Sequence, residues 1–456
     1  MVWHSGDHHT TKHWEPHDKR CCSCFSDGLS EGQASPSSLS LQQSRDSLTA
    51  SLTAFLRQHR NELGLLAAIL AVIAITATID DSYREKPGYN AKEILRQTSM
   101  LGIFALGAAI VIISGGIDLS SGAVIAMSST VCGSILFALS ETDANGIPMT
   151  ETGGIGILTV AILGTLFVGF LIGSFHAWLV TAVNLPPFVA TLASLVGLRS
   201  LARVLIPEVT REVSGIETTK LYVYHEQLAF LGETWWVALA VFATLALALW
   251  VLMSRTVIGR HIYAMGGNEA AAQLSGIRTD RLKWLAYCIG AVTASIAGIL
   301  YTGYVGTSDP TTLGMGYELN AIAAAVVGGC SLTGGIGTIL GTALGALFLR
   351  AVIDAVAKTI KSGADDYEGM IVGVLVVLAV ALNALRTDSG LARQFFNGKL
   401  GSVSIGILTL LSGTITFVMV ETNKISTAWI VVASVLALLS LRKYLEVAAM
   451  RKKSAL

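Results

Sequence analysis

Residues 255–283 read RTVIGRHIYAMGGNEAAAQLSGIRTDRLK. This is the one long, basic and polar loop between strongly apolar runs, which recur from residue 63 onward. The chain has 456 residues, of which 52% are hydrophobic and only 14% charged, against roughly 25% charged in soluble domains. We therefore expect an all-α polytopic membrane protein in which this loop lies in water. The net charge of zero argues against nucleic acid as a partner.

The same loop predicts a short helix. Asn268 is a good N-cap, and Glu269 places a negative charge where the helix dipole favours one. Ala270 and Ala271 are strong helix formers and Gly276 is a natural stop, so we expect about two turns. A helix this short does not persist alone in water. The membrane domain should hold it on one side, and its other side either docks into a partner protein or belongs to a solvated connector.

Twelve apolar runs approach the length of a membrane span. They are 63–79, 97–113, 122–139, 155–180, 187–206, 235–253, 284–304, 317–331, 336–356, 370–385, 404–420 and 427–441. Crossing about 30 Å of hydrocarbon takes about 20 helical residues, so several runs are short. Short runs interrupted by Gly predict broken or re-entrant helices that line a cavity instead of facing lipid.

The distribution of charge orients these runs. The loops 254–283 and 386–403 and the C-terminal tail are basic, which predicts that they face the cytoplasm. The loop 140–154 has three acidic residues and no Lys or Arg, and the loop 207–234 has five Glu against one Arg and one Lys. We expect both of these loops outside. Twelve crossings with both termini in the cytoplasm satisfy every loop.

Two Gly-rich stretches resemble each other: GGIDLSSG at 115–122 and GGCSLTGG at 328–335. Paired Gly-rich interruptions in the two halves of a transporter indicate a substrate path, while close helix packing through small residues is the alternative. Asp118 favours the path for the first stretch. An acid in the bilayer costs about 2.5–3.5 kcal/mol, so Asp118 should face a polar cavity, a partner or a helix N-terminus.

Two further motifs extend this candidate translocation path. NLPPFVATL places Pro187 at a helix start. In GMGYELN, Glu318 either stabilises a helix N-terminus or takes part in a gate or docking surface. Arg199 and Arg203 lie on one helix face, and we favour snorkelling to the outer interface over a polar cavity. The predicted path residues are Gly115, Gly116, Asp118, Ser120, Pro187, Thr191, Glu318, Asn320, Gly328 and Gly329.

The first 60 residues are polar, rich in Ser and His, and predict a mostly disordered tail. A metal-binding tail is the alternative, although its His and Cys spacing fits no defined zinc motif, so we expect no metal site. The residues available to a metal would be His8, His9, Cys21, Cys22 and Cys24. Neither a P-loop nor an HExxH motif occurs, so we expect no catalytic site and no cofactor in this chain.

Four ordered stretches carry a resemblance to a known family. They are ISGGIDLSSGAVIAM (113–127), LPPFVATLASLVGLRSLA (185–202), TVIGRHIYAMGGNEAAAQLSGI (256–277) and GYELNAIAAAVVGGCSLTGGIGTILGTALGAL (316–347). Together they resemble the permease subunit of bacterial ABC importers of the ribose/xylose/galactoside type, a group related to branched-chain amino-acid permeases. The resemblance covers about residues 90–385.

This resemblance implies a set of partners. A homodimer or pseudo-dimer of permeases would lie among the lipids of the cytoplasmic (inner) membrane, with separate ABC ATPase subunits inside the cell and a sugar-binding protein outside. The predicted short helix resembles the family's coupling helix, which docks into the ATPase. Its matching residues are Asn268, Glu269, Ala270, Ala271 and Gly276. ATP hydrolysis is then expected in the partner, and the acidic outer loops should receive the binding protein.

We therefore predict a transport subunit that moves a monosaccharide, ribose-like, into the cell. Its expected segments are a polar tail (1–60), a permease core of about ten spans (61–386), a cytoplasmic linker (387–403), an extra transmembrane hairpin (404–441) and a basic cytoplasmic tail (442–456). The tail and the hairpin depart from the usual plan of the family. The alternatives are an ion-coupled secondary transporter or channel that uses Asp118, and an ABC permease for a branched-chain amino acid or a nucleoside.

Overall fold

The structure is a computed structural model. It describes residues 60–144, 146–359, 368–375, 377–378, 398–419 and 424–454. The chain divides into two compact units, Met1–Arg60 and Asn61–Leu456, and the architecture below is that of the second. The predicted tail, with its His and Cys residues, and most of the predicted linker lie outside the described residues.

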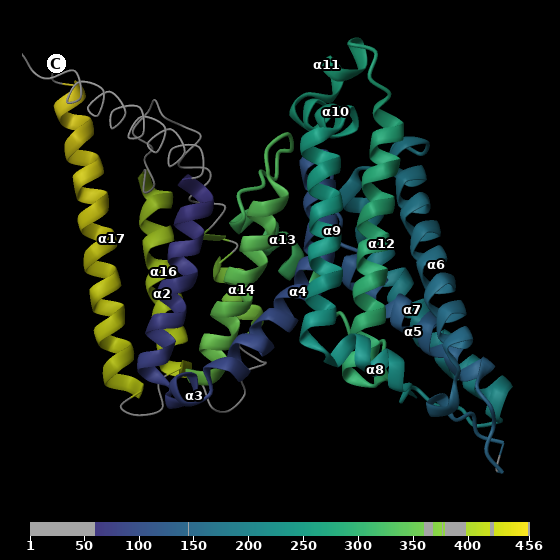
Figure 1. Ribbon diagram of the computed structural model, residues 1–456. Helices are drawn as coiled ribbons and strands as arrows, with labels where there is room; N and C mark the ends of the chain where they lie inside the picture. Colours follow the sequence, from purple (N-terminus) through teal and green to yellow (C-terminus); the bar gives the residue numbers. More distant parts are fainter. Residues whose placement is uncertain are drawn as a thin grey trace, which may run out of the picture. The chain divides into compact units, whose positions relative to one another are not determined.

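The second unit is built from helices, which confirms the predicted fold class (Figure 1). Its helices are α2 (Arg60–Ile79), α3 (Asp81–Glu85), α4 (Pro87–Ile113), α5 (Ser121–Leu139), α6 (Ile155–Thr181), α7 (Pro187–Ser214), α8 (Glu226–Glu233), α9 (Trp235–Arg255), α10 (Val257–Gly267), α11 (Glu269–Leu274), α12 (Thr279–Val305), α13 (Tyr317–Val327), α14 (Ile339–Thr359), α16 (Gly398–Met419) and α17 (Lys424–Ser454), with a 3-10 turn at Thr150–Thr152. Two short strands, β1 (Leu221–Tyr222) and β2 (Thr307–Ser308), pair antiparallel.

Nine of the described helices are long and apolar enough to cross a membrane. The run 317–331 contains α13, which has only 11 residues, as expected of a short run that Gly interrupts. Gly316, with φ +78°, precedes its first residue, and the second Gly-rich stretch follows its last. The apolar stretch of α16 is also short, at Gly401–Thr414, and the run 370–385 lies mostly outside the described residues.

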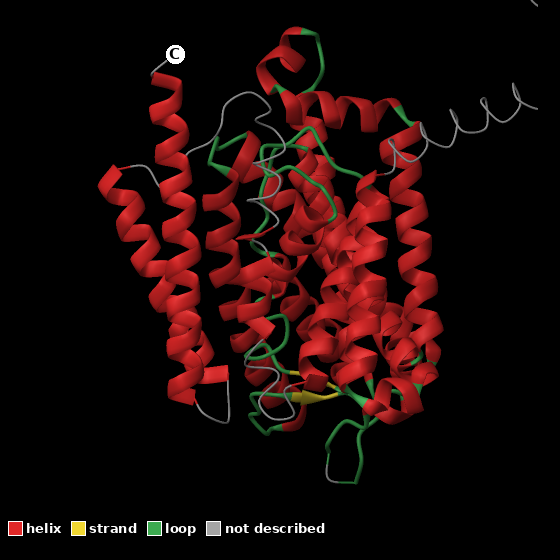
Figure 2. Cartoon of the chain, turned by 90° about the vertical axis from the view of Figure 1, so that its left-hand side faces the viewer, coloured by secondary structure: helices red, strands yellow, loops and turns green. Residues whose placement is uncertain are grey.

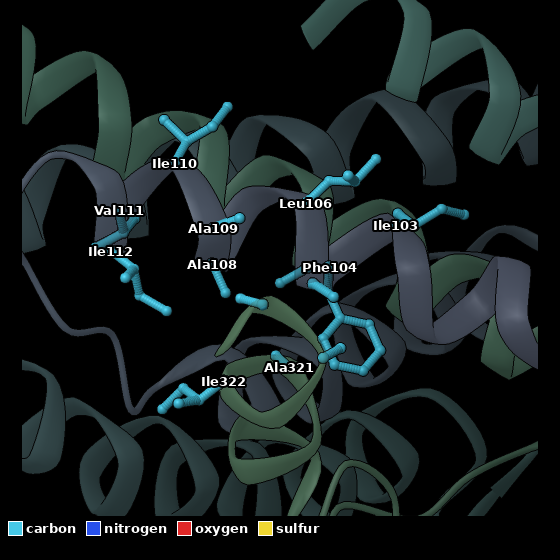
Figure 3. Close-up of a cluster of buried hydrophobic side chains, with 14 of the residues drawn as sticks. Ile103, Phe104, Leu106, Ala108, Ala109, Ile110, Val111, Ile112, Ala321 and Ile322 are labelled. Carbon is cyan, nitrogen blue, oxygen red and sulfur yellow. The ribbon is translucent and has the colours of Figure 1, made fainter. Parts of the chain in front are cut away.

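Helix α4 lies at the centre of the core. In its most apolar window 89% of the residues are buried, against 78% in α12 and 72% in α5. It contacts α9, α12, α13 and α14. Its second half reads MLGIFALGAAIVII and is apolar all round, as expected of a helix that other helices enclose. In Figure 3, Phe104, Ala108 and Ile112 lie on the side of α4 that faces Ala321 and Ile322 of α13, and other side chains of the stretch point away from them.

The two ends of this helical core differ. Helices α10 and α11 cap one end, whereas α8 and the two strands lie at the opposite end (Figures 1 and 2). Each of these short elements follows or precedes a spanning helix, and the strands join two loops that lie far apart in the sequence. The surfaces outside the spanning helices are therefore built by different loops at each end.

Small residues allow α6 to pack closely on α12. A Cβ atom added to Gly173 of α6 would lie 2.6 Å from Cys288 Cα and 2.7 Å from Tyr287 O. Helices in membranes associate through such close backbone approach, because burial of apolar side chains gives no advantage over lipid. A Cβ atom added to Gly156, on the same helix, would have no atom within 4 Å, so this glycine offers a matched control.

We expect Gly173→Ala to lower stability by about 1–3 kcal/mol, because the added methyl group overpacks the α6–α12 contact. Thermal unfolding in detergent measures this loss. Gly156→Ala should leave the melting temperature unchanged or raise it slightly, since Ala favours a helix over Gly. Equal melting temperatures of the two variants would contradict this account of the packing.

Candidate functional site

The two Gly-rich stretches meet in space. The first begins where α4 ends at Ile113, and the second joins α13 to α14. The amide of Gly335 donates to Ile113 O at 2.9 Å. A Cβ atom on Gly334 would lie 2.8 Å from Gly115 Cα, so the two backbones are in direct contact. The two stretches that resemble each other in sequence are therefore also neighbours in the fold.

Helix α10 contacts the same place. A Cβ atom on Gly266 would clash with Ile113 O and would lie 2.6 Å from Gly335 N. The Tyr263 hydroxyl, one turn earlier, donates to Gly337 O at 2.8 Å. We call the backbone contact of Gly115, Gly266, Gly334 and Gly335 the glycine junction. It connects the helix that leads to α11 with both breaks in the membrane core.

Asp118 lies in the first break and is 4% exposed. Its Oδ1 accepts hydrogen bonds from Ser120 N at 2.8 Å and from Ser120 Oγ at 2.6 Å. These contacts place the carboxylate at the N-terminus of α5, which is one of the three surroundings that the sequence allowed. A helix N-terminus stabilises an anion in the membrane through its dipole and its free amides.

Thr191 of α7 forms hydrogen bonds with the backbone of this break. Its Oγ1 accepts a hydrogen bond from Leu119 N at 3.2 Å. The hydroxyl also lies 3.0 Å from Pro187 O and 3.2 Å from Ile117 O, either of which can accept its hydrogen. Pro187 is the first residue of α7, as predicted. The structure therefore brings the NLPPFVATL motif to the first Gly-rich stretch.

Two polar side chains that the sequence did not assign to the path lie beside the same break. His176 and Tyr287 are 0% and 1% exposed, and their rings meet edge to face at 6.4 Å. The Tyr287 hydroxyl would lie 2.6 Å from a Cβ atom on Gly116. Among the described residues, neither imidazole nitrogen of His176 nor the Tyr287 hydroxyl has a hydrogen-bond partner. Unpaired buried polar groups are costly, so water or a hydroxylated solute would find partners here.

Arg199 holds the irregular segment that precedes α13. Its guanidinium donates to Pro310 O at 3.2 Å, to Leu313 O at 3.1 Å and to Gly314 O at 3.0 Å. The preference for snorkelling is therefore wrong for Arg199. Carbonyls that lack helical partners attract a guanidinium more strongly than a distant interface does, because hydrogen bonds to charged groups are the stronger ones. We call these three contacts the Arg199 clamp.

The remaining predicted path residues are Glu318, Asn320, Gly328 and Gly329, which lie in or next to α13. Glu318 lies in the first turn of α13, against Gly122 of α5, and its Oε2 is buried without a hydrogen-bond partner among the described residues. Asn320 instead donates to Glu368 Oε1 at 3.0 Å. Gly328 packs against the backbone of α14, and Gly329, with φ +97°, has open space around it. Asn320 and Gly328 thus lie in contacts of α13 with Glu368 and with α14.

The predicted short helix is present as α11. Asn268 Oδ1 accepts from Ala271 N at 2.9 Å, and Gly276 follows the helix with φ +81°. Glu269 forms an ion pair with Lys283 of α12 at 2.6 Å, which fixes α11 to the membrane core. Leu274, the last residue of the helix, is 92% exposed. The sequence pattern gave no signal for this exposed apolar tip.

A family model described as "Branched-chain amino acid transport system / permease component" matches residues 90–380. The chain belongs to this permease family. The ribose import permease protein RbsC of Escherichia coli (strain K12) is 35% identical over 319 residues, which cover 70% of this chain and 91% of the relative. The RbsC protein of Bacillus subtilis (strain 168) is 32% identical over 71% of this chain and 92% of its own length.

The galactose/methyl galactoside import permease protein MglC of Escherichia coli (strain K12) is 29% identical, over 72% of the permease and 95% of the relative. No solved structure matches the permease. The predicted family is therefore confirmed. The matched residues 90–380 include the glycine junction, Asp118, the Arg199 clamp and α11.

Replacing Arg199 with Met should lower the free energy of unfolding by about 2–4 kcal/mol, because three carbonyls lose a charged donor. Arg199→Lys should fall in between, since a single ammonium cannot match the guanidinium geometry. Thermal melts of the purified permease measure both. Arg203→Met is the control: this exposed arginine lies one turn further along α7, and its loss should change little. A similar loss in Arg203→Met would refute the clamp.

Proposed function

We propose that the permease is the transmembrane subunit of an ATP-binding-cassette importer that carries a monosaccharide into the cell, driven by separate ATPase subunits. The observation that carries this proposal is the glycine junction, where the helix leading to the exposed α11 touches both breaks of the core. The names of the similar proteins, ribose and galactoside import permeases, support a sugar as the solute.

The ATPase would dock on α11. An exposed leucine at the tip of a short, fixed helix is an apolar anchor of the kind that binds in a partner's groove. Leu274 has this exposure, and the Glu269–Lys283 ion pair links α11 to α12. Closure of the ATPase subunits would therefore push α10 against the glycine junction. This displacement would reach α4 through Ile113 and α14 through the segment around Gly335.

Solute would cross beside the first break. Asp118, His176, Tyr287 and Glu318 supply buried polar atoms there, and several have no partner within the described part of the chain. Such groups can exchange hydrogen bonds with sugar hydroxyls without selecting one sugar strictly. Selection would then rest with an extracytoplasmic sugar-binding protein, and a second copy of the permease would complete the path. The basic end with α10 and α11, and both termini, would face the cytoplasm across the inner membrane.

The test is capture of a candidate P-loop ATPase subunit from the same organism. Wild-type permease in detergent should retain the ATPase, and ATP hydrolysis in proteoliposomes should rise with sugar-loaded binding protein. Leu274→Asp and Glu269→Arg should each reduce the captured ATPase about tenfold or more, because loss of an anchor residue at an interface costs about 2 kcal/mol or more. Membrane insertion should remain normal.

Lys283→Ala is the matched control for Glu269, because it removes the same ion pair and leaves the outer face of α11 intact. If Lys283→Ala loses the ATPase as completely as Glu269→Arg does, Glu269 acts only by fixing the helix. If wild-type permease binds no ATPase under any condition, the importer mechanism is refuted. Full capture by Leu274→Asp would refute the docking surface alone.

Asp118→Ala should reduce sugar uptake more than it reduces the amount of permease in the membrane. The substitution removes the acceptor for both Ser120 donors and one polar group of the path. Uptake per molecule of inserted permease measures the effect, and Asp118→Asn, which retains an oxygen acceptor, is the matched control. Equal loss of uptake and insertion would make Asp118 purely structural. Uptake that follows a proton gradient without any ATPase would favour ion coupling instead.

A further inference from the structure

The two acidic loops that follow α5 and α7 meet at the end of the core opposite α10 and α11 (Figures 1 and 2). Between them lies a pocket of about 410 Å³. Ile147 and Met149 of the first loop line it from one side, and Ile216, Tyr222 and Tyr224 of the second loop line it from the other. We call it the loop pocket. Its polar and apolar walls come from segments about 70 residues apart in the sequence.

The loop pocket exposes apolar side chains outside the membrane-spanning helices. Its five apolar residues named above are between 40% and 57% exposed, and all lie outside the membrane-spanning helices. The rings of Tyr222 and Tyr224 stack on each other with centroids 6.0 Å apart. A contiguous apolar patch in water, with aromatic residues at its centre, is typical of a surface that binds another protein.

The charge of the two loops and the hydrogen bonds of the pocket hydroxyls indicate what kind of surface binds here. The loops 140–154 and 207–234 carry three and five acidic residues against two basic ones, so they attract a basic surface. The Thr and Ser hydroxyls of the pocket wall already have partners: Thr150 Oγ1 accepts from Tyr224 N, Thr210 Oγ1 accepts from Thr218 N, Ser214 Oγ donates to Thr210 O and Thr218 Oγ1 donates to Lys220 O. The apolar walls suit an inserted side chain.

We propose that the loop pocket receives an apolar side chain that projects from a basic rim on the extracytoplasmic sugar-binding protein. This inference rests on the proposed function and specifies where and how that partner docks. A volume of about 410 Å³ accommodates one or two large side chains. The charged loops attract and orient the incoming protein, and the apolar insertion supplies most of the affinity.

The loop pocket contacts the segment that leads into α13. Its residue Leu221 pairs with Ser308 in the β1–β2 ladder, and Lys220 forms an ion pair with Asp309 at 3.1 Å. Burial raises the pKa of the Asp309 carboxyl, but hydrogen bonds from Thr311 and Lys220 outweigh this effect and hold the pKa below its usual range. Asp309 is therefore ionised at neutral pH and keeps its ion pair with Lys220. Docking that shifts β1 would move the segment that leads into α13.

The experiment measures contact and affinity without the ATPase. A photo-crosslinking amino acid at position 222 of the permease in nanodiscs should crosslink to a candidate sugar-loaded binding protein from the same organism. Ile216→Lys and Tyr222→Ala should each weaken binding at least tenfold, and affinity should fall with added salt. Tyr89→Ala is the matched control, because Tyr89 is 65% exposed in the first turn of α4 and does not line the pocket.

The outcomes separate this inference from the proposed function. Unchanged affinity in Ile216→Lys, or a crosslink at position 89 and none at 222, would overturn the loop pocket as the docking site even if the ATPase still binds at α11. Binding of free ribose that Tyr222→Ala abolishes, with unaltered capture of the binding protein, would make the pocket a sugar site and also overturn the inference. In a separate assay with the ATPase in proteoliposomes, ATP hydrolysis without binding protein should remain at the wild-type rate in Ile216→Lys and Tyr222→Ala.

Discussion

Backbone polar groups inside a membrane must find hydrogen-bond partners within the protein, and most of this structure follows from that requirement. An unbroken helix meets it alone, but the core helices are broken between Ile113 and Ser121 and between Val327 and Ile339. The freed groups are satisfied by tertiary contacts. Gly335 N bonds to Ile113 O, and Leu119 N bonds to Thr191 Oγ1 of α7. Each break is therefore stable only together with its neighbours.

This dependence explains why the functional elements are mechanically connected. A break whose hydrogen bonds come from another helix cannot move without it. The glycine junction is the extreme case, because a side chain at Gly266 would clash with Ile113 O. Displacement of α10 must consequently be accommodated by both breaks at once. In the proposed mechanism, a force applied at α11 would change the backbone geometry near Asp118.

The irregular segment before α13 obeys the same requirement at the other end of the core. Carbonyls of residues 310, 313 and 314 have the Arg199 guanidinium as their donor, at 3.0–3.2 Å. The same segment begins at β2, which pairs with β1 beside the loop pocket. A continuous path of contacts therefore runs from the loop pocket through α13 to the glycine junction and α11. The two ends proposed to bind different partners are parts of one connected framework.

The sequence by itself determined the membrane class, the positions of most spans, the helix at Glu269 and the family. These depend on local composition and on short-range signals such as N-caps and Gly stops, which act within a few residues. It could also place Asp118 in a break, but not choose among its three possible surroundings.

Only the tertiary structure decided which distant segments meet. Arg199 binds backbone carbonyls instead of reaching the outer interface, and the run at 317–331 forms only the 11-residue α13. Leu274 is exposed at the tip of α11. The tertiary structure also brought His176 and Tyr287 to the first break. The physical reason is that a guanidinium, a glycine or a leucine has several acceptable environments. The choice among them is made by which backbone, hydroxyl or open water lies opposite once the helices have packed.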